Sequence, residues 1–342
     1  MGVTGPAGGN VIVAVDAGNS KTDAAVVAPD GTVLGSARGG GFQPQTAGVE
    51  RAVDMLQTTV TGALAAARTL RPGPLRIGHV SACLANADFP AEEELLATEL
   101  ARRVRPAGGQ GGPPSVEVAN DTFALLRAGL PDGGEPVGVA VVCGAGINCC
   151  GLAPGGRRAR FAAIGRISGD WGGGVHLAEE ALWWAARAAD GRGGPTALAH
   201  ALPAHFGLPT MAELIEALHL GRIDPARRHE LAPVLFAVAD AGDAVARALV
   251  ERQAEEVVAM ATAALRRLEL LDTAVPVVLG GGVLTARHAL LDEGIARLLA
   301  RRAPRAVARV VTAPPVLGAA LLALDRAAAP RRAYARLRAH YA

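Results

Sequence analysis

The hydrophobic pattern of the chain begins with short apolar runs that polar turns separate. Residues 11–15 are apolar and mostly β-branched, which predicts a buried strand. A polar turn containing Gly18 follows, and the pattern then predicts a second strand over 22–28 and a third over 32–36. The chain is therefore expected to open with three consecutive strands joined by tight turns.

The same pattern returns in the middle of the chain. An apolar run over 137–142 leads into a glycine-containing turn and a second apolar run, so that Gly144 takes the place of Gly18. The segment 154–156 then stands about where 29–31 stands in the first copy. Two related hairpins in one chain predict a duplicated architecture, whose two halves could face each other across a nucleotide.

The rest of the chain alternates predicted helices and strands. Apolar side chains recur at three- and four-residue spacing, which is typical of amphipathic helices. They predict helices over 47–69, 91–103, 122–128, 175–189, 197–205, 211–219, 243–270 and 317–328, with a further helix from Thr285. Short apolar runs predict strands over 76–81, 116–119, 275–279 and 307–312. This alternation predicts an α/β protein.

Length and charge restrict the function classes. The chain has 342 residues, of which 50% are hydrophobic, and this is enough for a sizeable core and two domains. The 34 basic and 32 acidic residues leave a net charge of only +2, which gives no electrostatic case for nucleic acid or an anionic membrane surface. The apolar tract 306–324 contains Arg309, Pro314 and Pro315 and is not expected to span a bilayer. We therefore expect neither nucleic-acid nor membrane partners.

Cysteine usage and the first residues predict the compartment. The cysteines are Cys83, Cys143, Cys149 and Cys150, and no two of them form a CxxC motif. Such sparse usage is typical of a reduced chain. Residues 1–10 contain neither the basic nor the apolar segment of a signal peptide. We therefore expect a cytoplasmic protein.

The turn at 18–22 carries the first candidate chemistry. A tight turn rich in Gly, Ser and Thr between two strands directs several backbone N–H groups into one concavity, which suits a phosphate. Lys21 and Thr22 resemble the end of a P-loop, but Ser20 and Val15 stand where that loop needs glycines. A strand also follows where the P-loop has a helix. The sequence therefore predicts a phosphate-binding hairpin and not a Walker loop.

Two aspartates lie at the ends of predicted strands. Asp16 ends the first strand, where it could hold Mg²⁺ through water; the alternative is a turn aspartate that bonds its own backbone. Asp121 lies between a strand and a helix, where it could accept the proton of a substrate hydroxyl; the alternative is a helix N-cap. The residues alone leave both alternatives open.

Two glycine-rich segments lie in the second half of the chain. Asp170 and Trp171 stand among five glycines, so Asp170 could bind sugar hydroxyls beside a wall formed by Trp171; the alternative is a surface turn. Gly280, Gly281 and Gly282 follow a predicted strand and leave room for a flat adenine or ribose. Close packing of a helix on a strand explains the three glycines equally well.

These motifs together resemble those of a known family. They are similar to those of the N-acetylglucosamine kinases, which belong to the BadF/BadG/BcrA/BcrD-type ATPases within the actin-like sugar kinase superfamily. The residues that carry the resemblance are Asp16-Ala-Gly-Asn-Ser-Lys-Thr22, Asn120-Asp121-Thr-Phe-Ala124, Cys143-Gly-Ala-Gly-Ile-Asn148, Gly169-Asp170 and Gly280-Gly281-Gly282. The resemblance covers about residues 11–324.

The resemblance implies a fold and an activity. Two ribonuclease-H-like domains would close over a nucleotide cleft. One would hold residues 1–122 and a returning C-terminal helix, 318–342, and the other residues 123–317 with a helical insertion. The activity would be transfer of the γ-phosphate of ATP to the 6-hydroxyl of N-acetylglucosamine, with Mg²⁺ as cofactor and a homodimer as the assembly.

The resemblance also implies a role for each matching residue. Asp121 would be the catalytic base. The ATP phosphates would lie against Gly18, Asn19, Ser20, Lys21, Thr22, Gly144 and Ala145, and adenosine against Gly281 and Gly282. The sugar would contact Gln43, Asp121, Gly146, Asn148 and Asp170. Asp16 would hold Mg²⁺ through water.

Four positions depart from the family pattern. Ala145 stands where a hydroxyl residue is common, Ile147 where a small polar residue is common, Trp171 where many members have an acid, and Gln43 where Asn is usual. Glucosamine, glucose or a modified amino sugar are therefore alternative acceptors.

Two functions of other classes fit the same motifs. One is that of an activator ATPase, which couples ATP hydrolysis to electron transfer through an iron–sulfur cluster and needs cysteines that face a partner. The second is that of a sugar sensor without catalysis, which the presence of Asp121 disfavours.

Overall fold

The computed structural model describes residues 10–104 and 112–342. The segment 1–10, which is expected to lack a signal peptide, lies outside these residues apart from Asn10. No helix in the described ranges is both long enough and apolar enough to cross a membrane.

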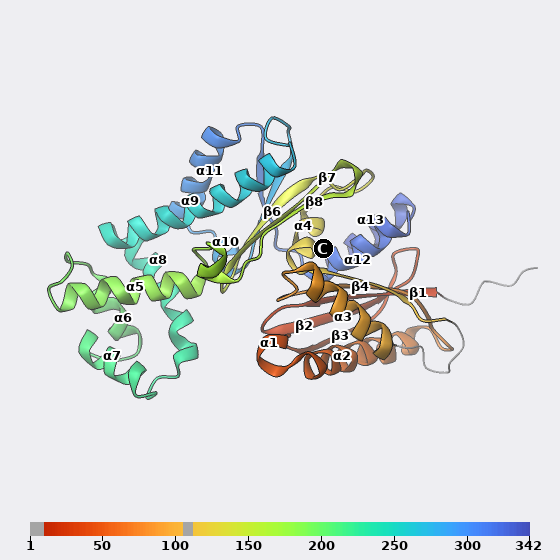
Figure 1. The fold of residues 1–342 in the computed structure, drawn as a ribbon, viewed down its shortest axis with the longest axis horizontal. Coiled ribbons are helices and arrows are strands. Elements are labelled where there is room, and N and C mark those ends of the chain that lie inside the picture. Colours follow the sequence, from red (N-terminus) through yellow and green to blue (C-terminus); the bar gives the residue numbers. More distant parts are fainter. Residues whose placement is uncertain (1–9, 105–111) are drawn as a thin grey trace, which may run out of the picture. The chain divides into compact units, whose positions relative to one another are not determined.

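The first half of the chain forms a five-stranded sheet (Figure 1). Its strands are β1 (Asn10–Ala17), β2 (Lys21–Val27), β3 (Val33–Gly40), β4 (Arg76–Leu84) and β5 (Ser115–Asn120), in the order β3-β2-β1-β4-β5. β2 runs antiparallel to β1 and to β3, whereas β4 runs parallel to β1 and β5 parallel to β4. The carboxyl ends of β1, β4 and β5 therefore meet at one edge of the sheet, and this edge receives both Asp16 and Asp121.

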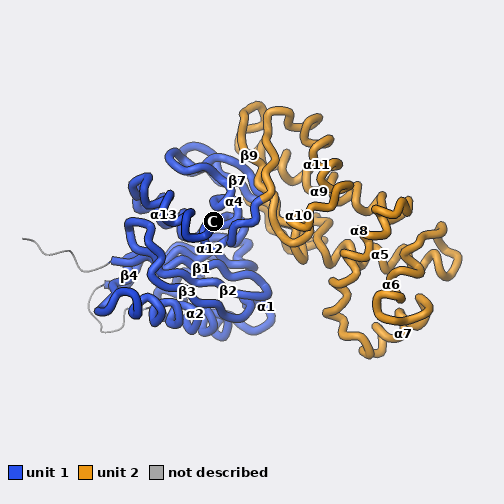
Figure 2. The backbone as a smooth tube through the Cα atoms, turned by 180° about the vertical axis from the view of Figure 1, so that it is seen from behind, with its two compact units in different colours: residues 1–140, 150–158, 311–342 blue, residues 141–149, 159–310 orange. Residues whose placement is uncertain are grey.

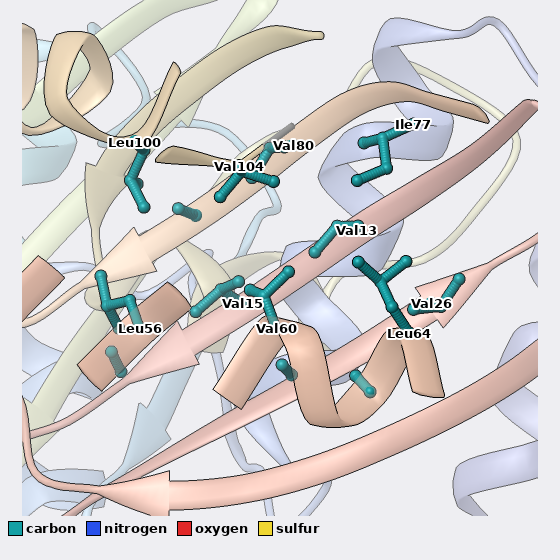
Figure 3. Close-up of a cluster of buried hydrophobic side chains, with 14 of the residues drawn as sticks. Val13, Val15, Val26, Leu56, Val60, Leu64, Ile77, Val80, Leu100 and Val104 are labelled. Atoms are coloured by element: carbon teal, nitrogen blue, oxygen red, sulfur yellow. The ribbon is translucent and has the colours of Figure 1, made fainter. Parts of the chain in front are cut away.

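Helices cover both faces of this sheet. They are α1 (Pro44–Ala47), α2 (Val49–Leu70), α3 (Pro90–Arg103), α4 (Thr122–Gly129), α12 (Pro315–Arg326) and α13 (Arg331–Tyr341). Side chains alternate between the faces of a strand, so Val13 and Val15 of β1 join a core with Leu56 and Val60 of α2 (Figure 3). The residues between them, such as Ala14, belong to a second core with α4, α12 and α13. Asp16 points to this second face.

The second half forms another five-stranded sheet with the same strand order. Its strands are β6 (Gly138–Cys143), β7 (Ile147–Ala153), β8 (Arg157–Arg160), β9 (Pro276–Gly280) and β10 (Val307–Val310). The order is β10-β9-β6-β7-β8, which is the order of the first sheet when each is counted from its own first strand. The predicted duplication of an α/β architecture is therefore confirmed.

The remaining helices mostly follow the predicted pattern, but the helix expected from Thr285 begins at Ala289. They are η1 (Pro154–Gly156), η2 (Gly165–Ser168), α5 (Gly174–Ala189), α6 (Leu198–His205), α7 (Met211–His219), η3 (Pro225–Glu230), α8 (Leu231–Asp240), α9 (Ala244–Arg267), α10 (Gly282–Thr285) and α11 (Ala289–Arg302). The helix expected over 47–69 is interrupted at Gly48, whose φ of 85° a helix does not allow. The single last helix expected over 318–342 is two helices, α12 and α13, and the sequence pattern does not predict α8.

The chain divides into two compact units (Figure 2). Unit 1 contains residues 1–140, 150–158 and 311–342, and unit 2 contains residues 141–149 and 159–310. The division expected at residue 122 stays a prediction. Because the two hairpins lie in different units, each half of the candidate site is described within its own unit.

Candidate functional site in two halves

The β1–β2 turn of unit 1 presents two free backbone donors. The Gly18 N–H donates to the Lys21 carbonyl at 2.9 Å, and the Gly18 carbonyl accepts from the Phe42 N–H at 2.9 Å. Asn19 and Ser20, between the bonded ends, are exposed, and their N–H groups donate to no acceptor in the described part of the chain. Two adjacent, outward N–H groups are what an anionic oxygen needs.

The Thr22 side chain points away from this turn. It is fully buried, and its hydroxyl has no hydrogen-bond partner among the described residues. Its strand partner on β3 is Gly39, and a Cβ on Gly39 would lie 2.1 Å from the Thr59 hydroxyl of α2. Thr22 therefore faces the α2 core, and its hydroxyl is directed away from the turn.

Asp16 is a buried carboxylate beside other acids. Its side chain is 7% exposed and accepts no hydrogen bond from the described residues, so the alternative of a turn aspartate is not supported. Burial raises the pKa of Asp16 to about 8; the carboxylates of Asp121 and Asp23 contribute to the rise, and Lys21 opposes it. An ionised Asp16 therefore needs a nearby positive charge. The protein supplies little of it, since the effect of Lys21 on the Asp16 pKa is smaller than the effects of burial, Asp121 and Asp23.

Asp121 sits at the same edge of the sheet, directly before α4. Its N–H donates to the Leu84 carbonyl at the end of β4, at 3.2 Å. The capping of α4 falls to Asn120, whose Oδ1 accepts from the Thr122 N–H at 3.0 Å and from the Thr122 hydroxyl at 2.6 Å. Asp121 occupies the N-cap position, but its side chain makes no capping bond, so the N-cap alternative is not supported. Burial raises the pKa of this half-buried carboxyl to about 6.

Gln43 is tied to the phosphate hairpin by a small amide network. Its Nε2 donates to the Asn19 carbonyl at 3.0 Å. Asn86 donates to the Asn19 side-chain oxygen at 2.8 Å and to the Phe42 carbonyl at 3.0 Å. Asn86 has a φ of 61°, a left-handed conformation that Asn tolerates better than most residues. Nothing in the sequence pattern singles out Asn86.

The β6–β7 turn of unit 2 repeats the arrangement of free donors. The Gly144 N–H donates to the Gly146 carbonyl at 3.0 Å. The carbonyls of Gly144 and Ala145 accept from Gly174 and Val175, the first residues of α5, at 2.7 and 3.0 Å. Ala145 and Gly146 are exposed, and neither N–H donates to a described acceptor. Each hairpin thus offers two consecutive free N–H groups.

Close packing of glycines holds this second turn in place. Gly173 has a φ of 86°, and a Cβ there would lie 2.5 Å from the backbone of Gly146. Its N–H donates to Oε1 of the fully buried Gln253 at 2.9 Å, a residue that the sequence pattern does not identify. Trp171, expected to wall a pocket, is only 6% exposed, with the Arg252 guanidinium 4.1 Å from its ring centre.

The other candidate residues of unit 2 lie around the same turn or beside β6. Asp170 is half-buried, its carboxylate accepts from the Ser168 hydroxyl, and its N–H donates to the Gly165 carbonyl at 3.1 Å. The Asn148 side chain accepts from the Cys149 N–H at 2.7 Å.

Close packing against the Cys143 backbone explains the glycine at position 281. A Cβ on Gly281, whose φ is 85°, would lie 2.5 Å from the Cys143 backbone, so the packing alternative holds at that position. A Cβ on Gly282 would meet open space, which leaves Gly282 accessible at the start of α10.

The sheet edge of unit 1 that carries Asp16 and Asp121 fits a magnesium ion whose other ligands are phosphate oxygens and water. No set of three His, Cys, Asp or Glu side chains in the described ranges could enclose a metal ion. Mg²⁺ in nucleotide enzymes uses one or two carboxylates together with phosphate oxygens and water. Asp16, buried and without a hydrogen-bond donor among the described residues, is the carboxylate that fits this role.

Curated proteins with sequence similarity are sugar kinases. The chain is 26% identical over 210 residues to the N-acetyl-D-glucosamine kinase of Dictyostelium discoideum, covering 61% of this chain and 65% of that protein. It is 27% identical over 176 residues to the N-acetylmuramic acid/N-acetylglucosamine kinase of Clostridium acetobutylicum, covering 52% and 56%. The aligned stretch therefore spans less than two thirds of each relative.

Solved structures with the same fold cover nearly the whole chain. A protein of Chromobacterium violaceum that has been proposed to be an N-acetylglucosamine kinase is 26% identical, with a TM-score of 0.64 over 92% of this chain and 98% of that one. The ROK family glucokinase of Streptomyces griseus, solved with glucose and AMPPNP, is 19% identical, with a TM-score of 0.54 over 92% and 99%. The similarity to the Streptomyces griseus glucokinase shows a shared fold and nothing about function.

The family itself is established by a match over most of the sequence. Residues 13–323 match the BadF/BadG/BcrA/BcrD ATPase family. This range includes both hairpins, Asp16 and Asp121, and the β9–α10 glycines. The chain belongs to the BadF/BadG/BcrA/BcrD ATPase family.

Proposed function

We propose that this chain is an ATP-dependent kinase that transfers the γ-phosphate of ATP to the 6-hydroxyl of N-acetylglucosamine or a related amino sugar. The observation that carries the proposal is Asp121, a half-buried carboxylate with a pKa raised to about 6, at the same sheet edge as a hairpin with two free N–H donors. The names of the similar kinases support the same activity.

Each hairpin would bind nucleotide phosphates through its own free N–H groups. The donors of Asn19 and Ser20 would contact the transferred phosphate, and those of Ala145 and Gly146 the inner phosphates. The backbone of Gly18, Lys21, Thr22 and Gly144 shapes the two turns. Gly282, with open space at its Cα, and Gly281 would flank the adenosine. Preorganised N–H donors stabilise charge on a transferring phosphoryl group without reorganisation.

Asp121 acts as the general base. A base works best when its pKa lies near the operating pH, and burial brings the pKa of Asp121 up toward neutrality. It would accept the proton of the sugar hydroxyl. Gln43 in unit 1, and Gly146, Asn148 and Asp170 in unit 2, are the residues proposed to contact the sugar. Asp16 would hold Mg²⁺ through water, and the ion would supply positive charge to the phosphate oxygens.

The electron-transfer alternative finds no support in the cysteines. An iron–sulfur cluster needs thiolate ligands. All four cysteines of the sequence, Cys83, Cys143, Cys149 and Cys150, are buried, and burial raises the thiol pKa of Cys143 and Cys150 to about 12. Buried, protonated thiols cannot bind a cluster at a surface. The kinase assignment is therefore favoured, and a homodimer and a cytoplasmic location remain part of the proposal.

The identity of the acceptor is tested by coupled ADP release. Purified protein and Mg-ATP are assayed with N-acetylglucosamine, glucosamine, glucose, N-acetylmannosamine and N-acetylmuramic acid, and without sugar. We expect release that depends on sugar and is fastest with N-acetylglucosamine or N-acetylmuramic acid. ADP release at the same rate with every sugar and with none would instead identify an ATPase.

A further inference from the structure

Helix α4 depends on contacts from the far end of the sequence. It has only 8 residues, and residues 122–128 are all buried. Helices this short are not stable on their own in water, so the position of α4 is set by what packs against it. Because Asp121 directly precedes α4, the same contacts determine where the proposed base lies.

The first turn of α4 lies directly against α12. A Cβ placed on Gly318 of α12 would lie 1.7 Å from the carbonyl oxygen of Ala124. Only glycine allows the two backbones to approach so closely. The α12 backbone at Gly318 therefore prevents the first turn of α4 from moving closer to α12.

The last turn of α4 is held by arginine side chains. Arg127 is 1% exposed and makes two hydrogen bonds, of 2.6 and 3.0 Å, to the Asp325 carboxylate of α12. Arg338 of α13 donates to the carbonyls of Ala128 and Leu130 at 2.8 and 2.7 Å. These are carbonyls that a helix C-terminus leaves without partners.

Asp132 joins the two arginines into one network. It accepts from Arg127 at 3.0 Å and from Arg338 at 2.6 and 3.0 Å. Charge-assisted, two-pronged bonds of this kind are stronger and more directional than single bonds between neutral groups. Residues about 200 positions apart are thereby joined at the end of α4 opposite Asp121.

We propose that the C-terminal helices α12 and α13 position the proposed base, with Arg338 as the positioning residue that holds the last turn of α4. This inference rests on the proposed kinase function. A rigid helix carries a displacement at one end to the other. A misplacement of about 1 Å of a reacting group costs up to about 100-fold in rate.

Arg338→Met and Arg336→Met make a matched pair of variants. Both arginines lie on α13 and pair with an aspartate, but Arg336 contacts Asp30 and Thr32 beside the β2–β3 turn, and no contact with α4 is among its hydrogen bonds. Arg127 is not the chosen site, because its side chain is 1% exposed and its replacement would leave a cavity and remove the ion pair with Asp325, which destabilises the whole fold. Arg338→Lys keeps the charge but loses the fork of donors.

The test measures kcat, KM for each substrate, and hydrogen exchange over residues 121–130. We expect R338M to lower kcat about 10- to 100-fold with KM for ATP unchanged, R338K to restore part of it, and R336M to stay within twofold of wild type. R338M alone should lose exchange protection over α4. Equal kcat and equal protection in R338M and R336M would overturn the inference. Wild-type protein without sugar-dependent ADP release would refute the proposed function, while the exchange result would still decide whether Arg338 holds α4.

Discussion

Asp16 and Asp121 lie close enough at the edge of the first sheet for their charges to interact. Burial raises the pKa of Asp16, and the Asp121 carboxylate raises it further, to about 8. Burial brings the pKa of Asp121 only to about 6. Without Mg²⁺, Asp121 is ionised between these two values while Asp16 holds a proton; a bound cation would favour the ionised form of Asp16. Pairs of carboxyls whose environments separate their pKa values often divide acid–base and charge-binding roles between them.

The pKa of Asp121 predicts an acid limb in the pH profile. A base must be deprotonated to act, so kcat/KM should be constant well above pH 6 and fall about tenfold per pH unit below it. The measurement is the initial rate of sugar-dependent ADP release between pH 5 and 9 at saturating Mg²⁺. A profile that stays flat down to pH 5 would argue against Asp121 as the base.

Replacing Asp121 by Asn should remove turnover and leave nucleotide binding intact. The loss expected for a general base is about 10²–10⁴-fold in kcat. Binding of a non-hydrolysable ATP analogue, measured by calorimetry, should change little. Asp54→Asn is the control, because Asp54 is an exposed carboxylate of α2 that pairs with Arg103, and it should keep wild-type kcat. Near-full activity in D121N would remove Asp121 from the mechanism.

Asp16→Asn should stabilise the metal-free protein at high pH. The pKa of Asp16 is about 8 in the folded chain, against an ordinary value of 3.8. The folded state therefore binds more protons than the unfolded state between these values, and stability falls as pH rises through that range. D16N removes this cost, so its melting temperature without Mg²⁺ should exceed that of wild type at pH 8 and approach it near pH 4.

The matched control for D16N is Asp30→Asn. The Thr32 N–H and Arg336 hold the pKa of the exposed Asp30 below its usual value, so D30N should not raise the melting temperature. D16N should also lose the activation by Mg²⁺ that we expect of wild type. If D16N melts no higher than wild type at pH 8, the inference that ionised Asp16 destabilises the folded protein is wrong.

Gly173→Ala should weaken nucleotide binding much more than Gly191→Ala. Both glycines have a φ near 85°, so alanine suffers the same backbone strain at either position. At Gly173 the new Cβ would also lie 2.5 Å from Gly146, whereas at Gly191 it would meet open space. Titration with an ATP analogue should show weaker binding in G173A only. Equal affinities would mean that the β6–β7 turn does not contact the phosphates.

The strands and turns of the site can be predicted from sequence because their signals are local. An apolar β-branched run followed by a glycine turn defines each hairpin, and the repetition of this pattern at Gly18 and Gly144 predicts the duplicated sheet. The position of Asp121 at the end of a strand can be predicted from sequence in the same way. The capping role of Asn120 is not, because either neighbour could cap α4.

The supporting residues cannot be predicted because their partners lie far away in sequence. Gln253 lies in the middle of α9 and meets Gly173 only in the folded unit, and Asn86 has no sequence context that indicates its bonds to Asn19. Helix α8 escapes prediction since its residues are apolar on nearly every side and include Pro233, so that no 3.6-residue period appears.

The most direct test of the proposed kinase activity identifies the product of the reaction. Protein, Mg-ATP and N-acetylglucosamine are incubated together, and the phosphorus and proton NMR spectra of the mixture are recorded over time. The proposed kinase activity predicts growth of a sugar 6-phosphate ester in step with ADP, with no growth when D121N replaces wild type. Inorganic phosphate as the only phosphorus product besides ADP, at a rate independent of the sugar, would contradict it.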